Sequence, residues 1–381
     1  SPSLRGNWRR ACGGSFAERD VGGFGHPMNL SSLLLDRVLA ALIFAIVALV
    51  VTSTLLALST FLLRLAHRRT ARTRTRLERE WTPLMNEVLF SGMPPLEIWR
   101  RIPRGQADFF IDFLLRYAGR IRGDEAVTLR RLARPFLEHL EELYASESVE
   151  TRARAVRALG QWRSGGCAEG GCIGMADPAP LVRLIAALNM AESRCPRCLE
   201  PFLARLADFD DWSVNLLASI LERCGGEAAE PLRLLLADPL RTLRERVVAC
   251  EALRRLGDPA TVPLVVRLIE AETDRDLLVS LMKFLAEYGT ERDFLLVLPF
   301  VSAKDPVIRG RALTTIAALA ADAEAVGILL EENVVDPDPW IALQSARAMT
   351  RPPLRTRLER LATVDGPVGA VARQVLEEAG R

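Results

Sequence analysis

The chain has 381 residues and a formal net charge of +2, and 49% of its residues are hydrophobic. This length suits two domains or one extended array of repeats. The charge is unevenly spread, because residues 1–80 hold 12 arginines and 5 acidic residues, whereas residues 81–381 hold 38 basic and 43 acidic residues. The larger part is therefore net acidic and poorly suited to binding phosphates, and we expect no nucleic-acid partner.

The first 27 residues are rich in glycine and lack a periodic pattern. Residue 1 is a serine, and the first methionine is Met28, directly before the patterned part of the chain. We interpret residues 1–27 as a disordered leader or a mis-extended start, and the fold prediction begins after them.

A long apolar run lies within residues 28–80. From Val38 to Leu63 there is no charged residue over 26 positions, and 16 of these are Leu, Ile, Val or Phe. A helix needs roughly 20 such residues to span a bilayer core, and insertion of this run gains up to about 6 kcal/mol. A core helix is rarely apolar on all faces over this length, and a cleaved signal has a shorter apolar region. Residues 38–63 are therefore predicted to form a transmembrane helix.

A dense series of arginines follows the apolar run. Those that we assign to lipid headgroups are Arg64, Arg68, Arg69, Arg72, Arg74 and Arg76. On the near N-terminal side only Arg37 is close, and Asp36 adjoins it. Because positive flanks stay in the cytoplasm, we expect the N-terminus outside and the C-terminal part inside, at a bacterial inner membrane. A nucleic-acid patch is the alternative interpretation, and the position beside the membrane disfavours it.

Residues 81–146 are predicted to be helical, but they do not follow the repeat that begins after them. We interpret the segments "WTPLMNEVLF" and "QADFFIDFLLRYAGRI" as an N-terminal cap that covers the first repeat. Such a cap needs one polar outer face, to which Arg116, Arg120 and Arg122 are expected to contribute.

Residues 147–381 contain a regular repeat. Small residues recur in equivalent helical frames at intervals of 31 to 34 residues: Ala155, Ala186, Ala218, Ala249, Ser280, Ala312 and Ala346. A polar residue lies three positions before most of them: Arg152, Arg183, Asn215, Arg246 and Arg309. Alternation of β-branched residues between turns does not occur, so only helices are expected. An interval of this length is typical of stacked helical repeats.

Turn residues recur along the same part of the chain. Asp-Pro pairs, which suit helix N-termini, begin at Asp177, Asp238, Asp258, Asp305 and Asp336. Glycines predicted to end helices are Gly160, Gly225, Gly257 and Gly289. In the helix expected after Asp238, the predicted apolar stripe consists of Leu240, Leu243, Val247, Cys250 and Leu253.

The repeat resembles that of HEAT-repeat proteins. The clearest matches are "ESVETRARAVRALG" from Glu147, "LRERVVACEALRRLGDPATVPLVVRLI" from Leu243 and "DPVIRGRAL" from Asp305. The resemblance implies an all-α fold, with one transmembrane helix followed by a right-handed α-solenoid of HEAT-like helix pairs over residues 147–381. Two features depart from the pattern, namely Leu277 at the usual arginine position and a glycine-rich insert after Gly160.

Four cysteines form a candidate metal site. Cys167 and Cys172 have C-x4-C spacing, and Cys195 and Cys198 have C-x2-C spacing. Four thiolates can hold zinc or an iron–sulfur cluster if the two pairs meet in space, and "CPRC" is also compatible with redox activity. The alternative is that the cysteines simply line a turn and a loop. A cytosolic position argues against structural disulfides.

Signatures of catalysis are missing from the sequence. It contains no nucleophile elbow, phosphate-binding glycine loop or H-E-x-x-H motif, and its histidines are His26, His67 and His139. We therefore predict no enzymatic activity and no cofactor. Trp212 and Trp340, at repeat helix starts, are either exposed binding anchors or packing residues between repeats.

The layout resembles bacterial single-pass HEAT-repeat proteins that occur alongside cell-envelope glycosyltransferases. This resemblance implies a membrane-anchored scaffold that contacts membrane lipids and binds partner proteins. A glycosyltransferase is the partner it suggests, with a supporting role in exopolysaccharide or envelope glycan synthesis. The alternative hypothesis is a metal-binding or enzymatic helical-repeat protein that uses the four cysteines.

Overall fold

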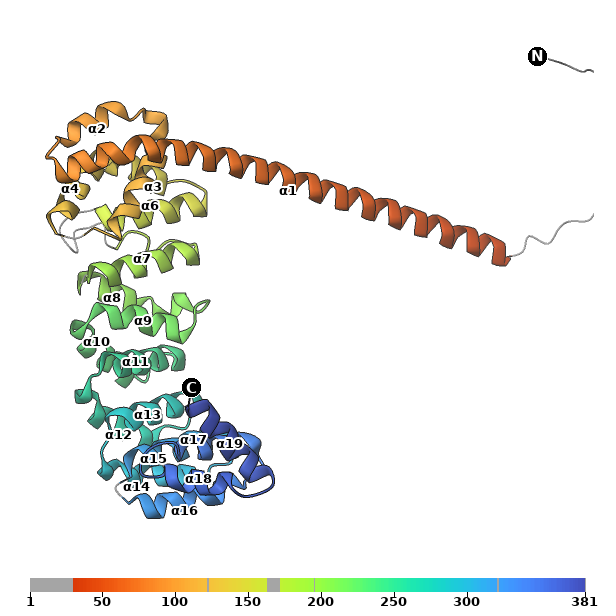
Figure 1. Cartoon of the computed structure of the whole chain (residues 1–381), viewed down its shortest axis with the longest axis vertical. Helices are drawn as coiled ribbons and strands as arrows, with labels where there is room; N and C mark the ends of the chain where they lie inside the picture. The colour runs from red at the N-terminus through yellow and green to blue at the C-terminus, as the bar shows by residue number, and fades with distance from the viewer. Residues whose placement is uncertain (1–29, 122, 163–171, 195, 321, 381) are drawn as a thin grey trace, which may run out of the picture. The chain divides into compact units, whose positions relative to one another are not determined.

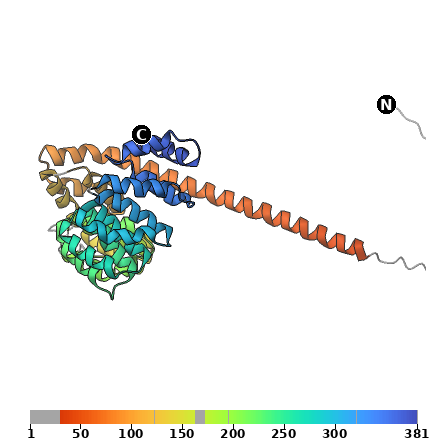
Figure 2. The same ribbon diagram turned by 90° about the horizontal axis from the view of Figure 1, so that it is seen from below.

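The computed structural model describes residues 30–121, 123–162, 172–194, 196–320 and 322–380. Within these ranges the regular elements are helices, and none is a strand (Figures 1 and 2). The prediction of an all-helical protein is confirmed for this part of the chain. The leader 1–27, Arg122, the glycine-rich insert, Cys167 and Cys195 lie outside the described residues.

The chain divides into two compact units, one ending at Glu80 and the other beginning at Trp81. Helix α1 (Leu30–Phe90) runs through this boundary without a break. In the first unit the described residues all belong to α1, and the remaining helices belong to the second unit.

The apolar part of α1 exposes its side chains. Phe44, for example, is 76% exposed. Its few polar groups bond within the helix, because the Thr52 hydroxyl donates to the carbonyl oxygen of Ala48 at 2.9 Å and Thr54 bonds in the same way. Among the described residues, α1 over Leu42–Phe90 is the one helix long and apolar enough to cross a membrane. The core helix of a soluble protein or a signal sequence can have the same length and composition.

The second unit begins with the last turns of α1 and four short helices. These are α2 (Pro95–Arg101), α3 (Ala107–Ala118), α4 (Asp124–Ala133) and α5 (Leu137–Tyr144). The Trp81 ring packs edge-on against Phe110 and Phe113, with centroid distances of 5.2 and 5.6 Å. Helices α3 and α5 both pack on the next helix, α6, while Arg116 and Arg120 are exposed. The role of residues 81–146 as a cap stays a prediction.

The rest of the second unit consists of two rows of helices. The first row is α6 (Val149–Trp162), α7 (Pro180–Ser193), α9 (Val214–Cys224), α11 (Leu243–Leu256), α13 (Arg275–Tyr288), α15 (Pro306–Leu319), α17 (Pro339–Ala348) and α19 (Pro367–Ala379). The second row is α8 (Pro196–Ala204), α10 (Ala229–Ala237), α12 (Val262–Ala271), α14 (Phe294–Val297), α16 (Ala323–Val334) and α18 (Arg355–Ala362). Each first-row helix packs on the next one in the row, and α10, α12, α16 and α18 each pack on the first-row helix that follows (Figure 1).

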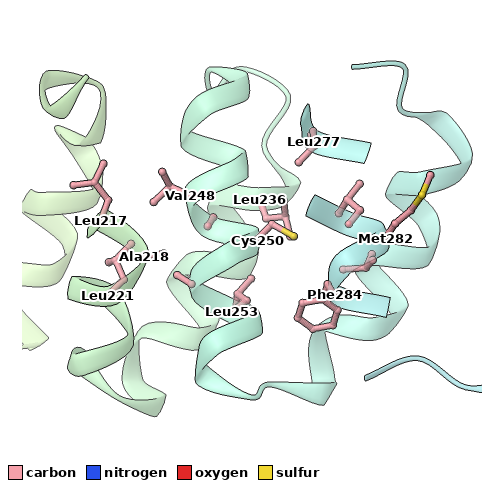
Figure 3. Close-up of a cluster of buried hydrophobic side chains, with 14 of the residues drawn as sticks. Leu217, Ala218, Leu221, Leu236, Val248, Cys250, Leu253, Leu277, Met282 and Phe284 are labelled. Carbon is pink, nitrogen blue, oxygen red and sulfur yellow. The ribbon is translucent and has the colours of Figure 1, made fainter. Parts of the chain in front are cut away.

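The small residues of the repeat lie between first-row helices. Six of the seven are fully buried: Ala155, Ala186, Ala218, Ala249, Ala312 and Ala346. Ser280 is the exception, because it is half-buried and its hydroxyl donates to the carbonyl oxygen of Asp276 at 2.9 Å. Leu281 is fully buried beside it, so the predicted register is wrong by one residue in α13. Figure 3 shows the core that these helices share, with Val248 of α11 pointing toward α9, which carries Leu217 and Ala218.

The predicted helix start after Asp238 is wrong. Helix α11 begins at Leu243, where Thr242 and Glu245 form a capping box, and Asp238 instead ends α10. Leu240 therefore precedes the helix and is 92% exposed, although it was expected in the apolar stripe. The capping box satisfies two backbone N–H groups, whereas the Asp238 side chain accepts from one, that of Leu240 at 2.9 Å. Asp305 does cap α15 as predicted, accepting from the N–H of Val307 at 2.8 Å.

The predicted helix end at Gly160 is also wrong. Gly160 lies inside α6, where a side chain would collide with Asn189 of α7, because an added Cβ would lie 2.2 Å from its Nδ2. Asn189 uses that close approach to donate to the carbonyl oxygen of Val156 at 2.8 Å. Gly257, in contrast, ends α11 as predicted, with a left-handed φ of +69°.

Candidate functional site

The arginines predicted to contact lipid lie along one stretch of α1. Five of them are exposed, namely Arg64, Arg68, Arg69, Arg72 and Arg76. Arg74 is half-buried and lies 3.5 Å from Glu78, and Arg76 lies 3.8 Å from Glu80. Such i,i+4 pairs on a helix surface are weak. The stretch is thus strongly basic at its start and mixed at its end, and its contact with headgroups stays a prediction.

The repeat arginines have structural roles. Arg152 donates to both carboxylate oxygens of Asp177, at 2.9 and 3.0 Å, and also to two backbone carbonyls before its own helix. Arg246 donates to Glu272 at 3.1 Å, and Arg309 lies 3.2 Å from Asp336. Each arginine thus connects its helix to the turn 25 to 27 residues later. These contacts recur at a similar spacing along the chain, and each one connects a first-row helix to the turn before the next first-row helix.

Two of these acids, Asp177 and Glu272, are held in their charged form. Burial alone would raise the pKa of Asp177, but hydrogen bonds from Arg152 and from the Ala179 N–H lower it below its ordinary value. Burial would likewise raise the pKa of Glu272, and the N–H groups of Asp274 and Thr273 lower it. These carboxylates are therefore committed to the fold and are unavailable as catalytic acids.

A second charged group, the Glu251 cluster, lies across α11 and α13 and consists of Glu251, Arg254, Arg255, Lys283 and Glu287. The Glu251 side chain is 6% exposed and accepts from Arg254 at 2.7 and 3.1 Å. It also accepts from Arg255 and from Lys283, each at 3.0 Å. Arg254 additionally pairs with Glu287. The opposing effect of burial is outweighed by these bonds, which lower the pKa of Glu251 to about 2.

Sequence reasoning did not identify the Glu251 cluster. Its local signal is a glutamate followed by arginines three and four positions later, which is common on solvated helices. The rarer signal is Lys283, one of two lysines in the chain. Only the packing of α11 on α13 brings Lys283 to Glu251.

A groove of about 550 Å³ lies between α8 and α10. Its apolar lining includes Leu199, Leu203 and Leu234, of which Leu234 is 64% exposed. Its charged lining residues are Glu200, Glu227, Glu230, Asp238 and Arg241. The groove therefore combines an apolar lining with charged side chains, most of them acidic.

The cysteines are only partly brought together within the described residues. Cys172 and Cys198 form a disulfide, with their Cα atoms 5.5 Å apart, so the expectation of no structural disulfide is wrong. Cys198 lies on α8 and is fully buried. The sequence spacing of the four cysteines did not indicate that Cys198 lies next to Cys172. Their partners in the predicted metal set, Cys167 and Cys195, lie outside the described residues. Sulfurs joined to each other are not thiolate ligands.

Two further cysteines are poor nucleophiles. Cys250 is fully buried, and burial raises the pKa of its thiol to about 12. Cys224 is half-buried, and burial raises the pKa of its thiol to about 11. Both thiols stay protonated near neutral pH, which agrees with a packing role.

His139 is the one histidine whose side chain the structure describes. Its Nε2 lies 2.9 Å from Asp108 and its Nδ1 lies 3.6 Å from Glu142. No serine or cysteine side chain joins this group in the described part of the chain. A histidine that contacts two carboxylates without a nucleophile beside it lacks the arrangement of a nucleophile and its base.

Trp212 and Trp340 were expected to be either packing residues or exposed binding anchors, and their environments differ. Trp212 is half-buried and packs against the core. Trp340 is 47% exposed, yet its indole nitrogen would lie 3.2 Å from a Cβ added at Gly310 of α15. Trp340 thus packs against the neighbouring helix with one face and presents the other to solvent.

Comparison with protein-family models finds no match for this chain, and comparison with curated proteins finds none either. The functional argument therefore rests on the residues and the geometry described above.

Proposed function

We propose that this chain is a single-pass membrane protein whose helical stack, a HEAT-like α-solenoid, serves as a cytoplasmic scaffold for partner proteins. One combination carries the proposal, namely an exposed apolar helix segment and a series of helices that each pack on the next, in one chain. The first is suited to lipid, and the second offers a long surface to proteins.

The anchor is the first step of the argument. Apolar surface left in water costs roughly 25 cal/mol per Å², and α1 exposes large side chains such as Phe44, Leu49 and Phe61. A bilayer removes this cost, and the threonine hydroxyls of the segment already bond to backbone carbonyls, as lipid requires. The arginines that follow favour a cytoplasmic location for the C-terminal part.

The Cys172–Cys198 disulfide opposes this orientation, because disulfides are rare in the cytosol. In the proposed topology both cysteines are reduced in the cell and remain neighbours in the fold. Their redox state in cells therefore tests the orientation independently of the arginines.

The solenoid is the second step. First-row helices contact their neighbours in the row. In three of them an arginine also pairs with a carboxylate that lies 25 to 27 residues later in the chain. Packing of this nearest-neighbour kind is the property that defines helical-repeat arrays. It supports the HEAT-like interpretation for residues 147–381.

The scaffold is the third step. The described residues offer an apolar groove at α8 and α10 and a charged cluster at α11 and α13, whereas the buried cysteines and the paired acids are committed to structure. An anchor raises the effective concentration of such surfaces toward other membrane proteins without any new contact. A cell-envelope glycosyltransferase is the partner that the layout suggests.

The topology is tested with full-length fusions in a Gram-negative host. A C-terminal green fluorescent protein is expected to fluoresce, and a C-terminal alkaline phosphatase is expected to be inactive. The reverse pattern would contradict the orientation. Partner binding is tested by purifying the tagged chain from detergent-solubilised membranes and identifying co-purifying proteins by quantitative mass spectrometry. An unanchored variant with Leu49→Arg and Leu56→Arg is the control, and recovery of the same proteins with both would argue against a tethered scaffold.

A further inference from the structure

The groove between α8 and α10 is lined by one face of each helix. Its lining residues on α8 recur every three or four positions, as Pro196, Leu199 and Leu203 do. Those on α10 recur in the same way, as Glu230 and Leu234 do. Because residues three and four positions apart lie on the same side of a helix, the groove extends along both helices.

The apolar lining of the groove is partly open to solvent. Leu199 of α8 and Leu235 of α10 are buried, whereas Leu234 is 64% exposed. Leu232 and Leu236 are fully buried, so α10 contacts the core through leucines other than the one that it exposes in the groove. An amphipathic helix at the surface of a protein ordinarily has polar residues on its outer face. Covering Leu234 with an apolar partner therefore lowers the free energy.

The charged side chains of the groove are mostly acidic. It has four carboxylates and one guanidinium group, that of Arg241. Arg241 lies 3.8 Å from Asp238 and 3.1 Å from Glu245. Glu230 accepts a hydrogen bond from Arg233 at 3.1 Å. Asp238 and Glu230 thus have basic partners within the chain.

Glu200 and Glu227 are the two remaining acids. Both are exposed, and in the described part of the chain no arginine or lysine forms an ion pair with either of them. Carboxylates beside an apolar surface favour a partner of the opposite charge. The groove therefore offers an exposed leucine and two carboxylates without counter-charges to the same ligand.

We propose that this groove binds a basic amphipathic helix of a partner protein. Apolar side chains on one face of that helix contact Leu199 and Leu234, which is the usual way in which an amphipathic helix occupies an apolar groove. Lysines or arginines beside them pair with Glu200 and Glu227. The proposal deepens the scaffold function and rests on it, because it names the chemistry of the segment that the scaffold holds.

The proposed location of the helical stack favours such a ligand. Cytoplasmic segments next to membrane spans are rich in lysine and arginine, and amphipathic helices at membrane surfaces have the same charge. A scaffold anchored at the cytoplasmic face of a membrane therefore meets basic amphipathic segments in its membrane partners. Nucleic acid is disfavoured, since the carboxylates of the groove repel phosphates.

The test uses the full-length chain in nanodiscs of phosphatidylcholine, followed by biolayer interferometry. The immobilised probe is a leucine–lysine peptide of about 18 residues, or five helical turns, with its leucines on one face. The controls are a scrambled peptide of the same composition and a leucine–glutamate peptide of the same pattern, and empty nanodiscs give the lipid background. The wild-type chain is expected to bind the leucine–lysine peptide saturably, and about tenfold more tightly than either control peptide.

Three variants assign the binding to the groove. Leu234→Gln is expected to weaken binding about tenfold, because the complex covers this leucine. Glu200→Gln combined with Glu227→Gln should weaken binding about fivefold and reduce its salt dependence. Glu200→Lys combined with Glu227→Lys reverses the charge and should give the chain affinity for the leucine–glutamate peptide.

Matched controls carry the same substitutions outside the groove. They are Leu295→Gln on α14 and the pair Glu270→Gln and Glu332→Gln on α12 and α16, all at exposed side chains. Each is expected to change the affinity by less than about twofold. Absence of saturable binding above the empty nanodiscs would overturn the proposal, as would an equal loss with the control variants.

A second copy of this chain is the competing occupant of the groove. Sedimentation velocity of the free chain in detergent tests it, and a monomer is the result that the proposal expects. A dimer that Leu234→Gln dissociates would assign the groove to self-association and overturn the proposal.

Thermal unfolding of each variant completes the experiment. Leu234→Gln is expected to leave the Tm unchanged, since the side chain is mostly exposed. If the Tm fell clearly, the charge-reversed variant would decide the question, because unfolding does not produce affinity for the leucine–glutamate peptide. None of these measurements contains a membrane partner or depends on topology. A failure here would therefore leave the co-purification test of the scaffold unaffected.

Discussion

The apolar segment of α1 and the first-row helices of the second unit are both rich in Leu, Val and Ala, but they treat these side chains in opposite ways. In α1, Phe44 is 76% exposed, whereas Phe284 of α13 is fully buried. Polar groups differ as well, because Thr52 bonds to its own helix while Thr315 of α15 donates to the carbonyl oxygen of Met282 in α13, at 3.2 Å. A similar composition thus suits two solvents, lipid in the proposed anchor and neighbouring helices in the stack.

The arginines of the two regions also differ in their surroundings. Those of α1 are mostly exposed, and Arg74 and Arg76 make weak i,i+4 contacts with Glu78 and Glu80. Those of the repeats connect separate elements through buried or half-buried carboxylates, as Arg152 does with Asp177. One residue type therefore provides a basic surface in one region and cross-links between helices in the other.

The largest expected effect comes from placing charge in the apolar segment. Leu49→Arg combined with Leu56→Arg should cost about 5–7 kcal/mol of insertion free energy, since each arginine near a bilayer centre costs roughly 2.5–3.5 kcal/mol. On alkaline carbonate extraction, the variant is expected to appear in the supernatant and not in the membrane pellet. Leu49→Ala with Leu56→Ala is the control and should stay in the pellet. If the arginine variant also stayed there, α1 would not be the anchor.

Alanine substitutions of two phenylalanines, one in each region, are expected to have different effects on stability. Phe284→Ala should lower the free energy of unfolding of the helical stack by about 3–5 kcal/mol, because it leaves a cavity in the core. Phe44→Ala should leave that free energy unchanged, since Phe44 does not belong to this core. Urea titration of both variants, followed by circular dichroism in detergent, makes the comparison. Equal losses would mean that α1 and the stack unfold as one unit.

The cysteine pair has an intermediate effect that depends on the compartment. A bridge across 26 residues stabilises by about 3 kcal/mol when it is formed. Cys198→Ser should therefore lower the Tm of the oxidised protein and have little effect on the reduced protein. Alkylation of whole cells with a mass-tagged maleimide should find both thiols free, as the cytoplasmic orientation requires. A protected pair in cells would place the stack outside the cytoplasm.

The smallest effect is the pH dependence of the Glu251 cluster. The pKa of Glu251 is lowered from 4.5 to about 2 in the folded chain, so its stabilising contribution is present above pH 4.5 and is lost as the pH falls toward 2. After allowance for solvent screening, this contribution is on the order of 1–2 kcal/mol. Denaturant titrations at pH 5 and pH 3 should show a smaller difference for Glu251→Gln than for wild type. Glu270→Gln, on the exposed face of α12, is the matched control and should behave as wild type does.

Much of the fold could be predicted from the sequence because helix periodicity is a local property. The absence of strand patterns predicted helices throughout, and the interval of small residues placed six of its seven positions, all six of them alanines, correctly between packed helices. Errors occurred where two local signals competed. At Asp238 the Asp-Pro pair suggested a helix start, yet the capping box at Thr242 begins α11 four residues later. At Gly160 a residue typical of helix ends allows the close approach of Asn189 instead.

The candidate site was less predictable than the fold. Exposed arginines beside an apolar run are visible in the sequence, because both features are contiguous. The Glu251 cluster joins residues 32 positions apart, and the packing of α11 on α13 decides how the four hydrogen bonds of Glu251 are distributed among Arg254, Arg255 and Lys283. Composition carries no record of that distribution.

By itself, the sequence determined that this protein is helical, that one helix is long and apolar enough for a membrane, and where charge is concentrated along the chain. These properties depend on neighbours within a few turns, so periodicity and composition are sufficient to state them. Only the tertiary structure decided which arginines are paired, that Cys172 meets Cys198, and that α8 and α10 leave a groove between them. Those outcomes depend on contacts between residues that lie 25 or more positions apart in the sequence. The geometry of such contacts is set by packing between helices and not by local preference.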